Sequence, residues 1–215
     1  MFTGIIEEIG IIKQKKRLSN HAIQMEIGAN IVLEDVNLGD SISVNGICLT
    51  VTEFTEHGFS VDVMPETMKT TSLHTLKARS QVNLERAMAA NSRFGGHFVT
   101  GHIDATGKIV KKEAKENAVY YWIQVPESLQ AYFIKKGSVA IDGISLTVFG
   151  IEKNFIQLSL IPHTTRETTL GEKGLGDIVN IECDMLLKHV HHLMQIETQV
   201  ERSALDKKLL LKNKF

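Results

Sequence analysis

The chain has 215 residues, of which 43% are hydrophobic and 23% are charged, and its formal net charge at pH 7 is −1. This composition is typical of a globular protein with a sizeable core, and it excludes a general attraction to nucleic acid or to an anionic membrane. No apolar run approaches the roughly 18 residues that span a bilayer, and Cys48 and Cys183 alone make neither a disulfide framework nor a zinc site. The opening "MFTGIIEEIG" carries acids where a secretory signal needs basic residues, so we expect a reduced, cytoplasmic protein.

Short alternating segments predict β-strands in the first ninety or so residues. "SISVNG" from Ser41 and "FSVDVM" from Phe59 alternate apolar and polar residues, whereas "ICLTV" from Ile47 is β-branched and largely apolar. The turn signals Asn45-Gly46 and His57-Gly58 separate them. Such strands predict a small closed or nearly closed antiparallel barrel, which leaves no strand edge exposed.

The same phrases recur 97 residues further along the chain. "NGICLTVTEF" from Asn45 becomes "DGISLTVFGI" from Asp142, and "VDVMPETMKTTSL" from Val61 becomes "LSLIPHTTRETTL" from Leu158. A repeat of this length is close to one small domain and far too long for a solenoid unit. Short helical inserts are expected around "TTSLHTLK" in the first copy and "PESLQAYFIKK" in the second.

The repeat also sets the domain boundaries. The same shift places "FTGIIEEIG" from Phe2 over "VTGHIDATG" from Val99 without a gap. The Gly95-Gly96 pair is typical of a flexible junction. We therefore predict two copies of one all-β barrel domain, residues 1–97 and 98–186.

Residues 187–215 have a different pattern. From Leu186 onward, apolar residues recur at intervals of three and four, which predicts an amphipathic helix; they are Leu186, Val190, Leu193, Ile196 and Val200. The stripe has no counterpart in the first copy. It is expected to pack against another subunit and form an oligomer, or to pack back on its own barrels.

The two copies differ at positions that matter for chemistry. Ile5, Cys48, Glu66 and Ala87 of the first copy align with His102, Ser145, His163 and Asp184 of the second. The second copy has thus gained groups that donate, accept or move protons near neutral pH. A hydrolase triad is disfavoured because "GISLTV" around Ser145 lacks the strand–elbow–helix sequence that exposes a nucleophile. His189 and His192 lie one helical turn apart but have no carboxylate or cysteine companions, so no metal site is expected.

Together the opening "MFTGII", the "NGICLTV" and "DGISLTV" pair, "GGHFVTGH" and "IPHT" resemble the α-chain type of riboflavin synthase over essentially the whole chain. This resemblance implies two similar six-stranded Greek-key barrels and a C-terminal helix through which three chains associate. It implies a dismutation of two 6,7-dimethyl-8-ribityllumazine molecules, in which a four-carbon unit moves from one to the other without a metal or redox cofactor. The products are riboflavin and 5-amino-6-ribitylamino-uracil. Association with lumazine synthase stays open.

The resemblance also implies matched ligand contacts in the two copies, at a site where the first barrel of one chain faces the second barrel of a neighbour. Those assigned to the first barrel are Phe2, Gly4, Ile5, Ile6, Cys48, Leu49, Thr50, Asp62, Val63, Met64, Pro65, Glu66 and Thr67. Those assigned to the second are Gly101, His102, Ile103, Lys136, Ser145, Leu146, Thr147, Ser159, Leu160, Ile161, Pro162, His163 and Thr164. His102, Ser145 and Thr147 are expected to transfer protons in the second barrel. Cys48 and Thr50 are expected to bind or activate the substrate in the first.

Three other functions are alternatives to catalysis by a riboflavin synthase. Relatives of this fold in luminous bacteria bind lumazine or flavin without converting it and serve as optical antennas. A flavin-binding reductase would need a nicotinamide-binding domain, and no G-x-G-x-x-G fingerprint follows a predicted strand. A purely structural trimeric module would not explain why the second copy gained ionisable and hydroxyl side chains.

Overall fold

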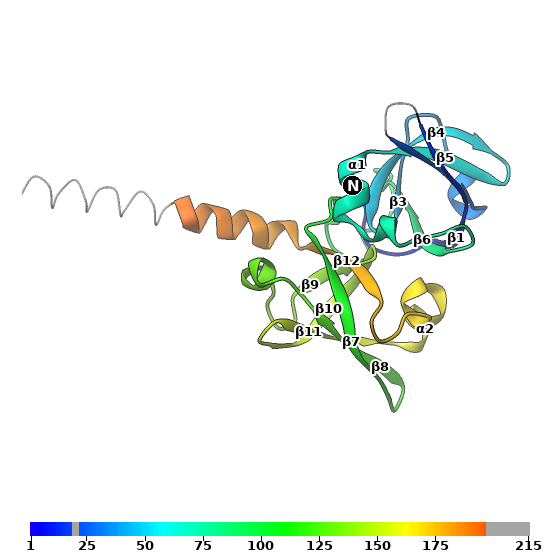
Figure 1. Cartoon of the computed structure of the whole chain (residues 1–215). Coiled ribbons are helices and arrows are strands. Elements are labelled where there is room, and N and C mark those ends of the chain that lie inside the picture. The colour runs from blue at the N-terminus through cyan, green and yellow to red at the C-terminus, as the bar shows by residue number, and fades with distance from the viewer. Residues whose placement is uncertain (19–21, 197–215) are drawn as a thin grey trace, which may run out of the picture.

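The computed structural model describes residues 1–18 and 22–196. It contains two closed antiparallel barrels of six strands each, which are joined at their sides, and a C-terminal helix that projects away from both (Figure 1). The predicted all-β class with an internal duplication is therefore confirmed.

The first barrel is a Greek key. Its strands are β1 Glu8–Arg17, β2 Ile23–Gly28, β3 Ser41–Val44, β4 Ile47–Thr55, β5 Gly58–Val63 and β6 Gln81–Arg86. Around the barrel the strands run in the order β1-β2-β5-β4-β3-β6. Strands β3, β4 and β5 form consecutive hairpins and β6 returns beside β3, which is the Greek-key connection. Alternate residues, among them Met25, Val61 and Leu84, fill the interior.

The second barrel repeats this arrangement. Its strands are β7 Ala105–Lys115, β8 Ala118–Gln124, β9 Ser138–Ile141, β10 Ile144–Glu152, β11 Phe155–Leu160 and β12 Ile178–Cys183. Their order, β10-β11-β8-β7-β12-β9, is the order of the first barrel with each strand replaced by its counterpart. The core includes Tyr121, Ile123 and Leu158. The 97-residue repeat of the sequence is thus a repeat of complete barrels.

Short helical turns connect the strands. The expected inserts are 3-10 turns, η2 Ser72–His74 in the first barrel and η3 Glu127–Tyr132 in the second. Two further turns are η1 Ile31–Leu33 and η4 Thr169–Gly171. The α-helices α1 Pro65–Thr70 and α2 Pro162–Glu167 were not predicted, because six residues are too few to show a helical period. Each begins with proline at its first position, where the missing N–H costs nothing.

Buried asparagines join the two barrels. Asn83 donates from Nδ2 to the carbonyl oxygen of Asp142 at 2.9 Å and accepts at Oδ1 from the backbone N–H of Thr169 at 2.8 Å. Its counterpart Asn180 donates in the same way to the carbonyl oxygen of Asn45 at 2.9 Å. These bonds relate the barrels by an approximate two-fold symmetry and hold them in one orientation.

The C-terminal helix covers residues 185–196 in the part of the chain that is described. Leu186, Val190, Leu193 and Ile196 are 55%, 53%, 65% and 44% exposed. The alternative that this stripe packs on its own barrels is therefore wrong for these four residues. Val200 and the remaining predicted tail lie outside the described residues. Within the described ranges no helix is both long enough and apolar enough to cross a membrane.

Candidate functional site

Two short segments cross from one barrel to the other. The backbone N–H of Cys48 in β4 donates to the carbonyl oxygen of Gly101 at 2.9 Å. In the matching bond, the N–H of Ser145 in β10 donates to the carbonyl oxygen of Gly4 at 2.7 Å. Each glycine comes before the first strand of its own barrel in the sequence, but its carbonyl oxygen is bonded to a strand of the other barrel, β4 for Gly101 and β10 for Gly4.

The isoleucines two residues after these glycines also contact the other barrel. Ile103 packs against the core of the first barrel, and Ile6 packs against the core of the second. The prediction grouped Gly4–Ile6 with the first barrel and Gly101–Ile103 with the second. The structure instead places Gly4 and Ile6 against the second barrel and Gly101 and Ile103 against the first, whereas Ile5 lines a cavity on the first barrel. The antiparallel bridge between Phe2 and Val99 lays the two segments side by side across the junction.

The structure thus forms two composite surfaces that are candidate binding sites, and we call each of them a cradle. The first cradle is Cys48–Thr50, Asp62–Thr67 and Gly101–Ile103. The second cradle is Ser145–Thr147, Ser159–Thr164 and Gly4–Ile6. The contacts across the junction bring each set together from both halves of the chain, although the sequence grouped each set within one half.

Two buried carboxylates anchor the crossing segments. Glu85 Oε1 accepts from the N–H of Thr3 at 2.7 Å and from its hydroxyl at 2.8 Å, and Oε2 accepts from the N–H of Gly4 at 3.0 Å. Burial raises the pKa of Glu85, and these hydrogen bonds oppose that rise. In the second barrel Glu182 accepts from the N–H and the hydroxyl of Thr100, both at 2.6 Å.

The glycines of the crossing segments allow a very close approach. Gly4 and Gly101 have φ values of +77° and +83°, which side chains rarely adopt. A Cβ atom on Gly4 would lie 2.7 Å from Cβ of Ser145, and one on Gly101 would lie 2.5 Å from Cβ of Cys48. Both positions therefore need glycine, for the backbone conformation and for the close contact.

In the first cradle, polar groups line the outer face of β4 and β5. Thr50 and Asp62 are exposed, and the pairing of Val51 with Val61 makes them neighbours across the two strands. Cys48 is half-buried. His102, predicted to act in the second barrel, is exposed and directly follows Gly101, whose carbonyl oxygen accepts from the N–H of Cys48 in the first barrel.

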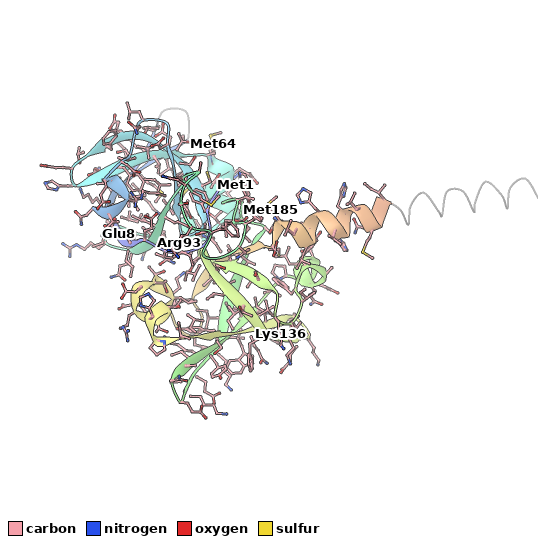
Figure 2. All side chains as sticks on the ribbon, turned by 180° about the vertical axis from the view of Figure 1, so that it is seen from behind. Met1, Glu8, Met64, Arg93, Lys136 and Met185 are labelled. Atoms are coloured by element: carbon pink, nitrogen blue, oxygen red, sulfur yellow. The ribbon has the colours of Figure 1, made fainter. Side chains whose placement is uncertain are left out.

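In the second cradle, Thr147 is exposed and Ser159 is half-buried on the neighbouring strands β10 and β11. Lys136 lies in the loop before β9, where its N–H donates to the carbonyl oxygen of Val148 at 2.8 Å. Figure 2 shows Lys136 on the second barrel and Met64 on the first. His163 is exposed in α2.

Some predicted contact residues point away from the cradles. Four of them are buried in the barrel cores, so they can offer a ligand only backbone atoms: Leu49, Val63, Leu146 and Leu160. Phe2 is fully buried against Val99 and Ala140 at the junction. The residues that remain accessible or half-accessible in α1 and α2 are Pro65, Glu66, Thr67, Ile161, Pro162 and Thr164.

His97 is a polar neighbour of the second cradle that was not predicted. Its Nδ1 lies 2.7 Å from Oγ of Ser145, and only 8% of the residue is exposed. Burial lowers the pKa of His97, while the negative charge of Asp184 acts in the opposite direction. His97 stands in the junction between the copies, so comparing aligned positions did not single it out. The phrase "GGHFVTGH", which contains it, was the available signal.

A separate cavity of about 390 Å³ lies on the first barrel. Of the predicted contact residues only Ile5 lines it, together with Ser41, Arg86 and others. The guanidinium of Arg86 donates to Glu7 at 2.6 Å and to Asp35 at 2.8 Å, and these carboxylates raise the pKa of Arg86. Both acids therefore pair with Arg86, which is one of the two arginines that line this cavity.

Comparison with known proteins agrees with the duplicated architecture. The family model of the lumazine binding domain matches residues 3–87 and residues 100–184, one match for each barrel. The chain is 56% identical over 194 residues to the riboflavin synthase of Bacillus subtilis (strain 168), covering 90% of both chains. It is 52% identical over 194 residues to that of Actinobacillus pleuropneumoniae, again covering 90% of both chains. The chain belongs to the riboflavin synthase family.

Solved structures related to riboflavin synthase share the two-barrel fold. LumP complexed with riboflavin superposes with a TM-score of 0.78 at 26% identity, covering 85% of this chain and 99% of LumP. LumP complexed with 6,7-dimethyl-8-(1'-D-ribityl) lumazine gives a TM-score of 0.76 at 26% identity, covering 85% and 98%. The resemblance that the sequence motifs indicated is confirmed.

Proposed function

We propose that this chain converts two molecules of 6,7-dimethyl-8-ribityllumazine into riboflavin and 5-amino-6-ribitylamino-uracil by transfer of a four-carbon unit. The observation that carries the proposal is the pair of matched cradles, in a chain 56% identical to a named riboflavin synthase. A reaction between two identical molecules needs two similar binding sites, and an internal duplication supplies them. LumP, which shares the fold, binds this lumazine.

The cradles offer suitable groups to such a ligand. Backbone N–H and C=O groups at strand ends can pair with the pyrimidine edge, and Asp62 and the threonine hydroxyls can bind ribityl hydroxyls. The reaction needs a base for the 7-methyl proton of one lumazine and a nucleophile or bound water at C7 of the other. In the first cradle His102, Cys48 and Thr50 are the candidates, and in the second Ser145 and Thr147. Holding two rings together can lower the barrier by about 7–11 kcal/mol.

The assembly belongs to the same proposal. Residues 1–97 and 98–186 would each form a lumazine-binding domain, and residues 187–215 would join three chains, because the apolar stripe of the helix is exposed. The complete active site would then lie between the first barrel of one chain and the second barrel of another. A cytoplasmic location and an association with lumazine synthase complete the proposal on family grounds.

A second candidate is an antenna that binds lumazine or flavin without converting it. The LumP complexes favour it, but their identity to this chain is 26%, against 56% for the riboflavin synthase of Bacillus subtilis. The chain also retains Cys48, Ser145 and Thr147 at the cradles. Catalysis is therefore the preferred function.

Mixing the purified protein with 6,7-dimethyl-8-ribityllumazine tests this choice. We expect riboflavin to appear at half the molar amount of lumazine consumed, followed by absorbance and chromatography. A matched control is His57→Asn, which changes an exposed histidine in the turn between β4 and β5 and should leave turnover unchanged. Tight binding without riboflavin would establish the antenna instead, and no binding would refute both functions.

A further inference from the structure

Backbone contacts fix the position of His97 next to Ser145. The N–H of His97 donates to the carbonyl oxygen of Thr3 at 3.1 Å, which fixes the histidine backbone beside the crossing segment. Gly96 lets the chain pass here, since a Cβ on it would lie 2.0 Å from the carbonyl oxygen of Thr3 and 2.9 Å from Cβ of Ser145. The backbone that carries the imidazole is thus fixed close to Ser145.

The protonation of His97 follows from its surroundings. The groups that act on the ring are the hydroxyl of Ser145 on β10 and the carboxylate of Asp184 after β12. Burial lowers the pKa of His97, so the ring is neutral near pH 7 and carries one hydrogen. Among the described residues, Nε2 is buried and has no hydrogen-bond partner.

The single hydrogen has a preferred position. A buried N–H without an acceptor is more costly and rarer than a buried lone pair without a donor. Within the described ranges, Oγ of Ser145 is the group that hydrogen-bonds to the ring, at 2.7 Å from Nδ1, and its lone pairs can accept a hydrogen. The hydrogen therefore belongs on Nδ1, where it is donated to the serine oxygen, and Nε2 carries the lone pair.

We propose that His97 is a positioning residue of the second cradle: its Nδ1–H donates to Ser145 Oγ and leaves the serine hydroxyl hydrogen for a negatively charged ligand. This inference rests on the proposed function and deepens it. A hydroxyl that already accepts a hydrogen bond is a stronger donor. Its target would be the oxygen or ring nitrogen that carries negative charge when a lumazine loses its 7-methyl proton. A donor placed there stabilises the anion.

The arrangement separates the two cradles chemically. At the position equivalent to Ser145 the first cradle has Cys48, whose thiol is a weaker hydrogen-bond donor and acceptor than a hydroxyl. His97 lies outside both repeat matches, residues 3–87 and 100–184, so the duplication did not produce it. The second cradle is thus the one that favours the anionic lumazine.

Nitrogen NMR of the full-length protein labelled in histidine tests the tautomer. We expect the His97 ring, assigned by its loss in His97→Asn, to carry hydrogen on Nδ1 and a bare Nε2 at neutral pH. The opposite tautomer would overturn the proposal, because Ser145 would then donate its hydrogen to Nδ1 of His97. A charged ring would also overturn it, because both ring nitrogens would then carry hydrogen.

Binding of 6,7-dimethyl-8-ribityllumazine to matched variants tests the role. His97→Asn keeps an amide donor near the place of Nδ1, whereas His97→Phe fills the space without a donor. We expect His97→Phe to weaken binding of the lumazine anion about fivefold to tenfold, and His97→Asn to restore most of that loss. The apparent pKa of the bound lumazine should rise in His97→Phe, a change that lost packing alone would not produce.

A double-variant cycle makes the result specific. Because the two residues act as a unit, Ser145→Ala with His97→Phe should bind no more weakly than Ser145→Ala alone. Additive losses, or wild-type binding by a folded His97→Phe, would overturn the inference. If His97→Phe fails to fold, the NMR tautomer of the wild-type ring decides. If the variants bind lumazine as expected but the wild-type protein forms no riboflavin, the proposed catalysis is refuted and the role of His97 in binding is still supported.

Discussion

Gly101 shows how the site depends on the absence of a side chain. It combines a φ of +83° with contact distances to Cys48 that leave no room for a methyl group. The positive φ alone strains any other residue by about 1–2 kcal/mol. The clash with the β4 backbone adds to this cost and would push the Gly101–Ile103 segment off the first barrel.

Gly101→Ala is expected to lower the free energy of unfolding by more than about 2 kcal/mol and to weaken lumazine binding together. Chemical denaturation and fluorescence titration would measure the two effects. Gly39→Ala is the matched control, because Gly39 has a φ of +91° with no atom within 4 Å of a new Cβ. If both variants lose the same stability, the close contact with Cys48 has no separate importance.

At the scale of elements, the barrels are held together by strand ends and turns rather than by a continuous sheet. Asn180 and Asn83 donate to carbonyl oxygens in the turn after β3 and in the turn before β10. The residues that carry these carbonyls, Asn45 and Asp142, have φ values of +48° and +47°. Asp142 is fully buried, and Lys173 donates to it at 2.6 Å. The junction is therefore polar, but most of its groups are paired.

Asn83→Ala should destabilise the protein by about 2–4 kcal/mol, because it leaves the N–H of Thr169 and the carbonyl of Asp142 buried without this partner. Thermal unfolding followed by circular dichroism would measure the loss. Asn91→Ala, at an exposed position in the linker, is the control and should change stability little. An equally mild effect at Asn83 would mean that water replaces the lost bonds.

At the scale of the whole molecule, the described part of the C-terminal helix leaves its apolar stripe exposed. Lys188 pairs with Asp104 at 3.0 Å and the ring of His191 contacts Tyr132, so the start of the helix is attached to the second barrel. Further along, the helix extends beyond the barrels (Figure 1), and its residues Leu193 and Ile196 are 65% and 44% exposed. Such a stripe is suited to packing against the same helix of other chains.

Leu193→Glu is expected to shift the protein from trimer to monomer, because it would bury a charge in the helix contact. Sedimentation would measure the mass. Gln195→Glu adds the same charge on the opposite face of the helix and should leave the trimer intact. A wild-type protein that sediments as a monomer would refute the assembly proposal, and with it the shared active site.

The sequence by itself determined the duplication, the two barrels, the apolar stripe and the family. These features follow from the local spacing of apolar and polar residues and from a constant shift of 97 residues between the copies, and neither requires knowledge of contacts. It also identified Gly4, Gly101, Cys48 and Ser145 as positions of interest, because the copies agree or differ there.

Only the tertiary structure decided how these residues combine. Gly4 and Ile6 contact the second barrel and Gly101 and Ile103 contact the first through long-range contacts, among them the bridge from Phe2 to Val99, that no local pattern encodes. The pairing of His97 with Ser145 joins residues 48 positions apart and lies outside the repeat. The exposure of the stripe likewise depends on where the helix leaves the barrel. Contacts between distant segments arise from packing the whole chain, and therefore the sequence pattern could indicate the parts of the site but not their partners.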